Sequence, residues 1–367
     1  MTMSETPKHG RCRFQYSLRS LLLFVLLASL GMSWYAVRAK RAREQKAAVE
    51  EIKKLGGSVL YDYELPAIRY GLAIPGPPGP AWLRGLLGDD FFATVASVAF
   101  ENSTVRPPLA DDGLKYLRRL TKLQYLDLGN THVTDAGLEQ IKGLTNLEHL
   151  DLSSTRVTDP GLVHIKGMTK LVLLNLESTK VTDAGLEHIK GPTSLQSLDL
   201  GSTGVTDTGL GHLKGMTQLD QLLLHGTHVT GTGLGHLVGM APLRELDLGE
   251  TQVTDAGLAQ IAGLTRLQTL LLAGTHVTDT GLESIRGLTK LMHLDLEHTQ
   301  VTDRGLKYLK GMTKLEELAL DETKVSDAGL EYLKGMTHLK RLSLFNTGVS
   351  DEGVERLQQA LPNCEIE

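Results

Sequence analysis

The chain is dominated by a repeat of 24 residues, which occurs ten times in succession between Leu123 and Pro362. One copy, from Leu291 to Lys314, reads LMHLDLEHTQVTDRGLKYLKGMTK. Each copy opens on a Leu-x-x-Leu-x-Leu pattern, and the three leucines recur without an insertion or a substitution. A fixed period over about two thirds of the chain is typical of a solenoid, in which each unit packs only on its neighbours. The 367 residues therefore predict one elongated array rather than several globular domains.

Most polar positions of the repeat have a structural explanation. The leucine pattern predicts a short strand whose second and third leucines point inward. A threonine nine residues into each copy, such as Thr131, predicts a ladder of hydroxyls that bond backbone groups where strand becomes loop. The Val-Thr-Asp-x-Gly-Leu segment predicts a short helix that is capped by Thr134 or Asp135, so we interpret the aspartates as caps and not as catalytic acids. At Gly137 and its equivalents, a side chain would press against neighbouring backbone.

The expected fold is a curved α/β solenoid, with a parallel β-sheet on the concave face and short helices on the convex face, preceded by one transmembrane helix. Residues 20–37 are uncharged and long enough to cross a bilayer, and Trp34 and Tyr35 lie at their end as interfacial aromatic residues do. A basic tail, residues 1–19, precedes this segment. A cleavable signal peptide is the alternative, but no convincing small-x-small cleavage site follows. Residues 38–57 predict a juxtamembrane helix that acts as a spacer.

The segments next to the repeats are expected to close the open ends of the core. SVLYDY from Ser58 predicts a short strand, and AIPGPPGP from Ala73 excludes regular structure there. Val95, Val98 and Phe100 echo the leucine spacing and indicate a degenerate repeat. We therefore expect an N-terminal cap and degenerate first repeat in residues 58–122, ten repeats in residues 123–362, and a C-terminal cap in residues 351–367.

The residues that point outward from the strands are the positions of the repeat whose identity the fold does not determine. We therefore expect a ligand to bind at these residues. They form three columns with ten acids and a single Lys or Arg side chain, Arg341. The middle column alternates with a period of 48 residues, which keeps its carboxylates about 10 Å apart and lowers their repulsion. Duplication of a two-repeat block also explains this alternation. The candidate partner-binding residues are Asp127, Asp151, Glu177, Asp199, Leu223, Glu245, Asp247, Leu271, Asp295, Glu297, Glu317 and Asp321.

Other functions find less support. A formal net charge of -5 gives no basic field for nucleic acid. No Gly-rich phosphate loop, nucleophile elbow or Cys-x-x-Cys pair is present, so we predict no enzyme and no cofactor. His293, Asp295 and Glu297 share a strand face, but residues two apart on a strand diverge by about 7 Å, so a metal site is not predicted. Cys12 and Cys364 lie at opposite ends of the chain, which excludes a disulfide framework.

The motif L-x-x-L-x-L-x-x-T-x-V-T-D-x-G-L-x-x-L-x-G-L/M-T resembles the ribonuclease-inhibitor-like branch of leucine-rich repeats, especially bacterial membrane-anchored versions of unknown function. In those proteins too, an SLRSLLL-like span precedes a Gly-Gly-Ser-Val-Leu-Tyr-Asp strand. The resemblance covers essentially the whole chain and implies a curved solenoid used for protein binding, without a catalytic residue. F-box substrate receptors share Val-Thr-Asp-x-Gly-Leu, but here a membrane anchor takes the place of the F-box segment, so a ubiquitin-ligase role is not expected.

Three functions remain open. The first is a single-pass membrane protein whose repeats lie outside the cytoplasm and bind a protein that offers a basic and apolar segment, or a surface polymer. The second is a structural cell-envelope spacer whose carboxylates only keep it soluble. The third is an unrecognised enzyme or metal site on the concave carboxylates. Basic residues flank both ends of the span, so the expected orientation rests on the resemblance and on the shortness of the preceding segment.

Overall fold

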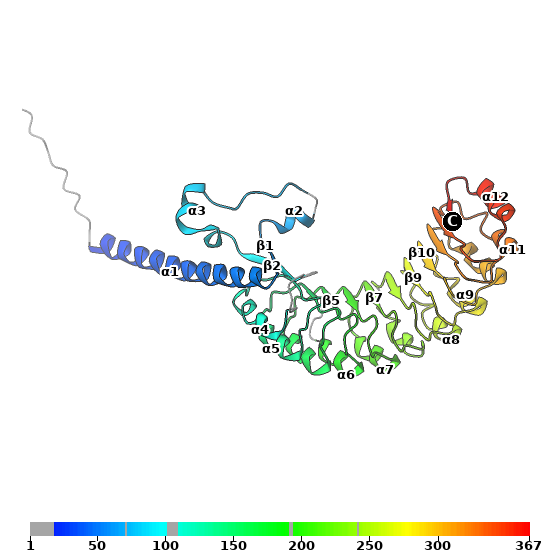
Figure 1. The fold of residues 1–367 in the computed structure, drawn as a ribbon, viewed down its shortest axis with the longest axis horizontal. Coiled ribbons are helices and arrows are strands. Elements are labelled where there is room, and N and C mark those ends of the chain that lie inside the picture. Colours follow the sequence, from blue (N-terminus) through cyan, green and yellow to red (C-terminus); the bar gives the residue numbers. More distant parts are fainter. Residues whose placement is uncertain (1–17, 70–71, 101–108, 191–193, 241) are drawn as a thin grey trace, which may run out of the picture.

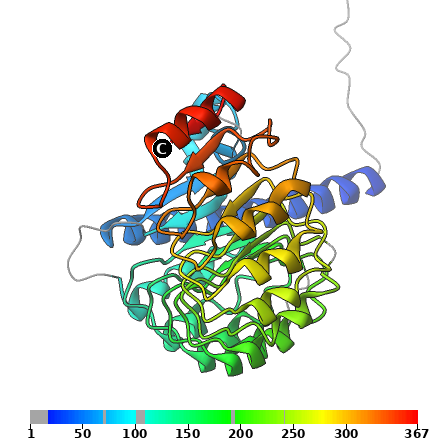
Figure 2. The same cartoon turned by 90° about the vertical axis from the view of Figure 1, so that its right-hand side faces the viewer.

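The computed structural model describes residues 18–69, 72–100, 109–190, 194–240 and 242–367. Within these ranges the repeats form a curved solenoid, with strands along the inner side of the arc and short helices along the outer side (Figure 1). Seen from the C-terminal end, the units stack behind one another (Figure 2). The predicted α/β solenoid is confirmed. The predicted basic tail, residues 1–19, lies outside the described residues except for its last two positions.

One sheet of thirteen strands runs in chain order through the described residues. The first two strands are antiparallel, whereas all later neighbours are parallel. From β3 onward neighbouring strands are offset by one repeat, so that Leu294 pairs with Leu318. Residues at the same position of the repeat therefore stack in columns. The strands are β1 (Ser58–Tyr61), β2 (Val95–Ala99), β3 (Tyr125–Asp127), β4 (His149–Asp151), β5 (Leu173–Asn175), β6 (Ser197–Asp199), β7 (Gln221–Leu223), β8 (Glu245–Asp247), β9 (Thr269–Leu271), β10 (His293–Asp295), β11 (Glu317–Ala319), β12 (Arg341–Ser343) and β13 (Glu365–Ile366).

The helical segments of the repeats are short, because each occupies only the part of the unit between two loops. The α-helices are α4 (Asp111–Leu114), α5 (Asp135–Ile141), α6 (Asp183–Leu186), α7 (Asp207–Leu210), α8 (Asp255–Ala259), α9 (Asp279–Ile285), α10 (Asp303–Leu306), α11 (Asp327–Leu330) and α12 (Asp351–Ala360). The 3-10 helices are η2 (Leu117–Arg119), η3 (Asp159–Ile165), η4 (His188–Lys190), η5 (Gly211–Leu213), η6 (Leu234–Leu237) and η7 (Lys307–Gly311).

A continuous apolar core and a ladder of threonines hold each strand in place. In the unit of β7, Leu219, Leu222 and Leu224 are fully buried. The hydroxyl of Thr227 donates a hydrogen bond to the carbonyl oxygen of Leu224 at 2.6 Å. The same bond occurs at each of the other nine threonines, so the predicted ladder is confirmed.

The aspartate of Val-Thr-Asp joins adjacent units, which corrects the prediction that it caps its own helix. Oδ1 of Asp279 accepts a hydrogen bond from the backbone N–H of Thr302, one repeat later, at 2.8 Å, and Oδ2 accepts one from the Thr302 hydroxyl at 2.7 Å. Thr302 then caps α10 by accepting from the N–H of Arg304 at 3.3 Å. The same pair of bonds links Asp111 to Thr134, Asp135 to Thr158, Asp159 to Thr182, Asp183 to Thr206, Asp255 to Thr278, Asp303 to Ser326 and Asp327 to Ser350.

This aspartate ladder explains the glycine that follows it. A Cβ on Gly305 would lie 2.5 Å from Oδ1 of Asp279, so the obstacle is a carboxylate of the preceding unit more than backbone. The ladder is interrupted where Gly231 replaces aspartate. Gly231 has a φ of 106°, and its Cα would lie 2.6 Å from a Cβ on Gly257, so the two backbones approach directly.

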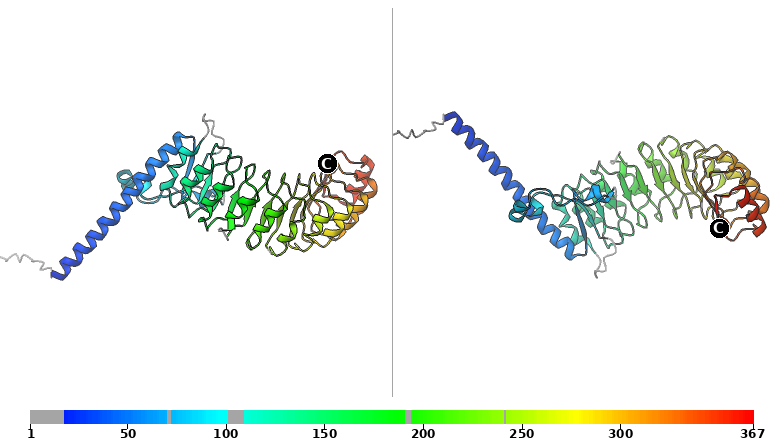
Figure 3. Two further views of the ribbon diagram at one scale, coloured as in Figure 1. Left: turned by 90° about the horizontal axis from the view of Figure 1, so that it is seen from below. Right: turned by 90° about the horizontal axis from the view of Figure 1, so that it is seen from above.

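The N-terminal helix α1 (Leu18–Lys54) is one unbroken helix through both the predicted membrane segment and the predicted spacer. Its last turns bury Ala48, Val49 and Ile52 in the same core as Val98 and Phe100. Residues 38–57 therefore do not act as a free spacer, because their second half covers the open end of the core. Figure 3 shows that α1 leaves the array obliquely.

A lobe of residues 62–94 connects β1 to β2 and is called the N-terminal lobe below. It contains α2 (Leu65–Arg69), α3 (Ala81–Leu87) and the 3-10 helix η1 (Asp89–Phe91). The lobe lies beside the middle of α1 in Figures 1 and 3. At the other end of the array, α12 and β13 cover the last repeat, and Leu357, Leu361 and Cys364 are buried there.

Candidate functional site

The strands present every second side chain on the inner face of the arc. The central residue of each strand from β3 to β11 is buried, and the two residues beside it are half-buried. Together with the residue two positions beyond the strand, they form three columns. The first column holds Glu245 and Glu317, the middle column holds Asp127, Asp151, Asp199, Leu223, Asp247, Leu271 and Asp295, and the third column holds Glu177, Glu297 and Asp321. All twelve candidate residues are half-buried, Leu223 and Leu271 included.

The aspartates of the middle column also have a local structural role, which was not predicted. Oδ1 of Asp199 accepts a hydrogen bond from the N–H of Gly201 at 2.9 Å, and Asp127, Asp151, Asp247 and Asp295 make the same bond two residues ahead. Asn175 does so with an amide oxygen. This is the Asx turn, and Asp or Asn at the end of a strand was the sequence signal for it. Part of the acidity of the middle column therefore serves the turn.

A histidine that was not among the candidates lies between two of the acids. Nε2 of His225 is 3.5 Å from Oε1 of Glu177, and Nδ1 is 3.5 Å from Oδ2 of Asp247. A Cβ on Gly201 would lie 2.1 Å from the imidazole, so this glycine makes room for the ring. Burial, together with Glu177 and Asp247, raises the pKa of Asp199 despite the bond from Gly201 and the nearby His225. The acids here are crowded and partly desolvated.

A second set of closely spaced carboxyls, those of Asp295, Glu297 and Asp321, lies near the C-terminal end of the concave face. Burial is the largest cause that raises the pKa of Glu297, to about 6, and Asp295 and Asp321 raise it further. Burial likewise raises the pKa of Asp295, although its bond from the N–H of Glu297 acts in the opposite direction. Negative charge is therefore in excess around these three carboxyls.

Glu297 is expected to make the repeat domain less stable as pH rises from about 4.5 to about 6. The folded chain keeps this carboxyl protonated up to about pH 6, whereas the unfolded chain releases the proton near 4.5, the ordinary value. The folded state thus holds more protons in this window, and the stabilisation present below pH 4.5 is lost as pH rises through about 6. Urea denaturation across this range should show a flatter pH dependence for Glu297→Gln. Glu139→Gln on the convex side is the control, and an unchanged slope for Glu297→Gln would refute the assignment.

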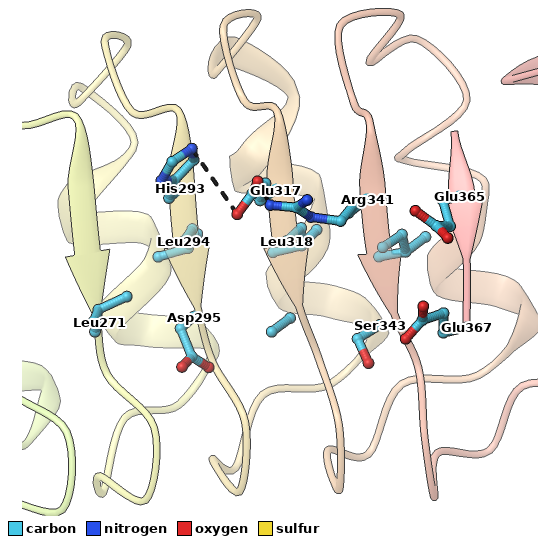
Figure 4. A pocket seen from close by; sticks show the side chains of 12 residues that line it. Leu271, His293, Leu294, Asp295, Glu317, Leu318, Arg341, Ser343, Glu365 and Glu367 are labelled. Carbon is cyan, nitrogen blue, oxygen red and sulfur yellow. Dashed lines mark hydrogen bonds and ion pairs between the residues drawn. The ribbon is translucent and has the colours of Figure 1, made fainter. Parts of the chain in front are cut away.

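The end of the concave face contains a depression of about 270 Å³, whose lining side chains are shown in Figure 4. His293, Glu317 and Arg341 form one row along it, and Asp295 and Ser343 lie on a parallel row beyond Leu294 and Leu318. Arg341, the single Lys or Arg side chain of the columns, forms an ion pair with Glu317, and Nε2 of His293 is 4.0 Å from the same carboxylate. The positive charge of Arg341 is therefore already neutralised.

Among the described residues, no group of three or more His, Cys, Asp or Glu side chains has an arrangement that could hold a metal ion. His293, Asp295 and Glu297 are thus not brought together as ligands. The apolar part of α1 is long and apolar enough to cross a membrane, and none of it is buried against the rest of the described chain. A membrane span or a signal sequence has these properties.

The comparisons with known proteins identify the fold family. A family profile described as a leucine rich repeat matches residues 121–181, and a second with the same description matches residues 191–213, 240–262, 287–310 and 335–357. The chain is a leucine-rich-repeat protein. Its assignment to the ribonuclease-inhibitor-like branch stays a prediction. Leucine-rich-repeat solenoids are typical protein-binding scaffolds, and such scaffolds are typically not enzymes.

Solved structures with a similar fold include an internalin from Listeria monocytogenes, which is 24% identical with a TM-score of 0.55; the match covers 69% of this chain and 75% of that one. A leucine-rich-repeat protein from Leptospira interrogans is 20% identical over 69% of this chain and 74% of that one, with a TM-score of 0.46. A plant peptide hormone receptor, solved with a bound hormone, is 15% identical over 70% of this chain and 49% of its own, with a TM-score of 0.45. No curated protein matches the sequence.

Proposed function

We propose that this protein is a membrane-anchored scaffold whose concave face binds a protein segment that is both basic and apolar. The observation that carries the proposal is the charge balance of the three columns, where ten acids face one cation, Arg341, that is already paired with Glu317. A cationic partner would lower the mutual repulsion of the carboxyls, and partly exposed Leu223 and Leu271 offer it apolar contact. The exposed apolar half of α1 would anchor the scaffold in a bilayer, with the repeats on the extracytoplasmic side as the resemblance implies.

The choice of variants follows from the turns of the middle column. An asparagine keeps the oxygen that accepts the turn hydrogen bond, as Asn175 does with the N–H of Glu177 at 2.9 Å. The combined variant Asp199→Asn, Glu245→Gln, Asp247→Asn and Asp295→Asn therefore removes charge and leaves these turns intact. Its matched control is Lys142→Gln, Lys166→Gln, Lys214→Gln and Lys310→Gln, which changes four charges on the convex side.

The concave variant is expected to bind a synthetic Lys- and Leu-rich peptide about tenfold more weakly than the unmodified chain, which corresponds to roughly 1.4 kcal/mol. Its binding should also depend less on ionic strength, because fewer charges are screened. The full-length protein in detergent is the appropriate sample, since a chain beginning at Ser58 would lack the core residues Val49 and Ile52. Fluorescence anisotropy of the labelled peptide gives the affinity at each salt concentration.

A Glu- and Leu-rich peptide of the same length tests whether charge sign matters. If both peptides bind equally, or if the convex control loses as much affinity as the concave variant, the concave carboxylates are not the binding site. Retained affinity in the concave variant would place the binding surface on the loops or on the N-terminal cap. Absence of binding by the unmodified chain would favour a structural spacer.

A further inference from the structure

The N-terminal lobe exposes large apolar side chains that the repeat array does not cover. Leu72, Ile74, Trp82 and Leu86 are 63%, 57%, 73% and 74% exposed. The sequence YGLAIPGPPGPAWL, from Tyr70 to Leu83, contains no charged residue. Arg84 follows, and its Nη1 is 3.5 Å from Oδ1 of Asp89, so its charge is paired within the lobe. Several large apolar side chains exposed within one short segment of the chain indicate an interaction surface.

The lobe is attached to α1 at the end of the apolar segment. The ring of Phe91 packs on Trp34 and Tyr35, with centroid distances of 6.2 and 5.7 Å. Nε of Arg38 donates a hydrogen bond to the carbonyl oxygen of Phe91 at 2.7 Å. The lobe therefore meets α1 at the residues expected at the level of the lipid headgroups.

A second attachment two turns further along α1 fixes the orientation of the lobe. Nε2 of Gln45 donates to Oδ1 of Asp90 at 2.9 Å and to the carbonyl oxygen of Ala93 at 3.1 Å, and its Oε1 accepts from the N–H of Val95 at 3.1 Å. The hydroxyl of Tyr61 also donates to Asp90 at 3.1 Å. With two points of attachment, the lobe cannot swing freely about α1.

We propose that the N-terminal lobe lies in the headgroup region of the bilayer and inserts the side chains of Trp82 and Leu86. This inference rests on the membrane anchoring proposed above. The two residues are one helical turn apart on α3 and so share a face. Figure 1 places α3 on the side of the lobe that is farther from the repeat array. An uncharged segment with an exposed tryptophan beside the end of a membrane span suits the interface.

The consequence is a second contact with the membrane beside the span itself. A single helix would allow the array to rotate and tilt relative to the bilayer. Because the last turns of α1 belong to the core of the array and the lobe is attached to α1, contact of the lobe with lipid would fix how the concave face is directed. Insertion of the lobe thus presents the proposed binding face in one orientation.

The chain contains two tryptophans, Trp34 and Trp82, so each can be observed separately. Trp34→Phe leaves Trp82 as the reporter for the lobe, and Trp82→Phe leaves Trp34 as the reporter for the span; phenylalanine keeps an aromatic ring at both sites. The full-length variants are reconstituted into phosphatidylcholine vesicles whose acyl chains are brominated close to the headgroup. Both reporters are expected to lose fluorescence relative to unbrominated vesicles. Adding Leu86→Asp to the Trp34→Phe chain should restore the fluorescence of Trp82.

The outcomes distinguish the two proposals. If Trp34 is quenched by brominated lipid and Trp82 is quenched only by aqueous iodide, the lobe is in water and this inference is wrong, while the anchor stands. If neither quencher reaches Trp82, protein covers the lobe, most simply a second copy of the chain, and the inference is again wrong. If brominated lipid quenches neither tryptophan, the membrane anchoring itself is refuted.

Discussion

Leu222→Asp is expected to unfold the repeats around β7, with a loss of about 4–5 kcal/mol or more in the free energy of unfolding. Leu222 is fully buried at the centre of β7, so the variant removes apolar contacts and places an unpaired carboxylate in the core. Each repeat is stabilised by its neighbours, and the units of β6 and β8 should open with it. Urea denaturation followed by circular dichroism gives the loss, and amide hydrogen exchange locates it.

Asp199→Asn is the control on the opposite face of the neighbouring strand. The amide oxygen can still accept the hydrogen bond from the N–H of Gly201, as Asn175 does in its own unit. Burial and nearby acids raise the pKa of Asp199, so a neutral side chain relieves a cost. The change in stability should stay within about 0.5 kcal/mol or be favourable. Equal losses in the two variants would contradict the assignment of inward and outward positions.

The features that could be predicted from the sequence are those that a single repeat determines. The inward leucines follow from the alternation of side chains along a strand, and the hydroxyl of Thr131 bonds the carbonyl oxygen of Leu128, only three residues away. Both relations lie within one unit and recur ten times, so the pattern is unambiguous. The placement of the three columns follows from the same alternation.

The features that were missed depend on how neighbouring units approach one another. Asp279 bonds Thr302 across 23 residues, whereas capping rules consider only the aspartate's own helix. His225 lies beyond the end of its strand. Its ring fits between Glu177 and Asp247 only because Gly201, in the neighbouring unit, has no side chain to occupy that space. Val49 and Ile52 of α1 are buried in the core of the array, but nothing in the sequence specified which surface they meet, so the spacer was predicted instead.

Asp279→Ala is expected to cost roughly 2 kcal/mol, because two hydrogen bonds to Thr302 are lost and a partly buried N–H is left without its acceptor. The two distances, 2.8 and 2.7 Å, indicate good geometry for both bonds. Urea denaturation of the variant gives the loss. Asp279→Asn should cost less, since its oxygen can still accept from the backbone N–H. A loss below about 0.5 kcal/mol for Asp279→Ala would show that water replaces the carboxylate.

A double-mutant cycle with Thr302→Val separates the bond from other effects of each change. If the Thr302 hydroxyl acts mainly through Asp279, the double variant should lose less than the sum of the single variants, with a coupling on the order of 1 kcal/mol. The repeat with Gly231 gives the physical reason for expecting a local effect: the missing carboxylate is accommodated there because Gly231 has a φ of 106° and its backbone approaches that of Gly257. An alanine at position 279 would not readily adopt this positive φ, so the space that the carboxylate occupies beside Gly305 would stay unfilled. The unit of α10 should therefore loosen, and hydrogen exchange should increase there before it increases at β3.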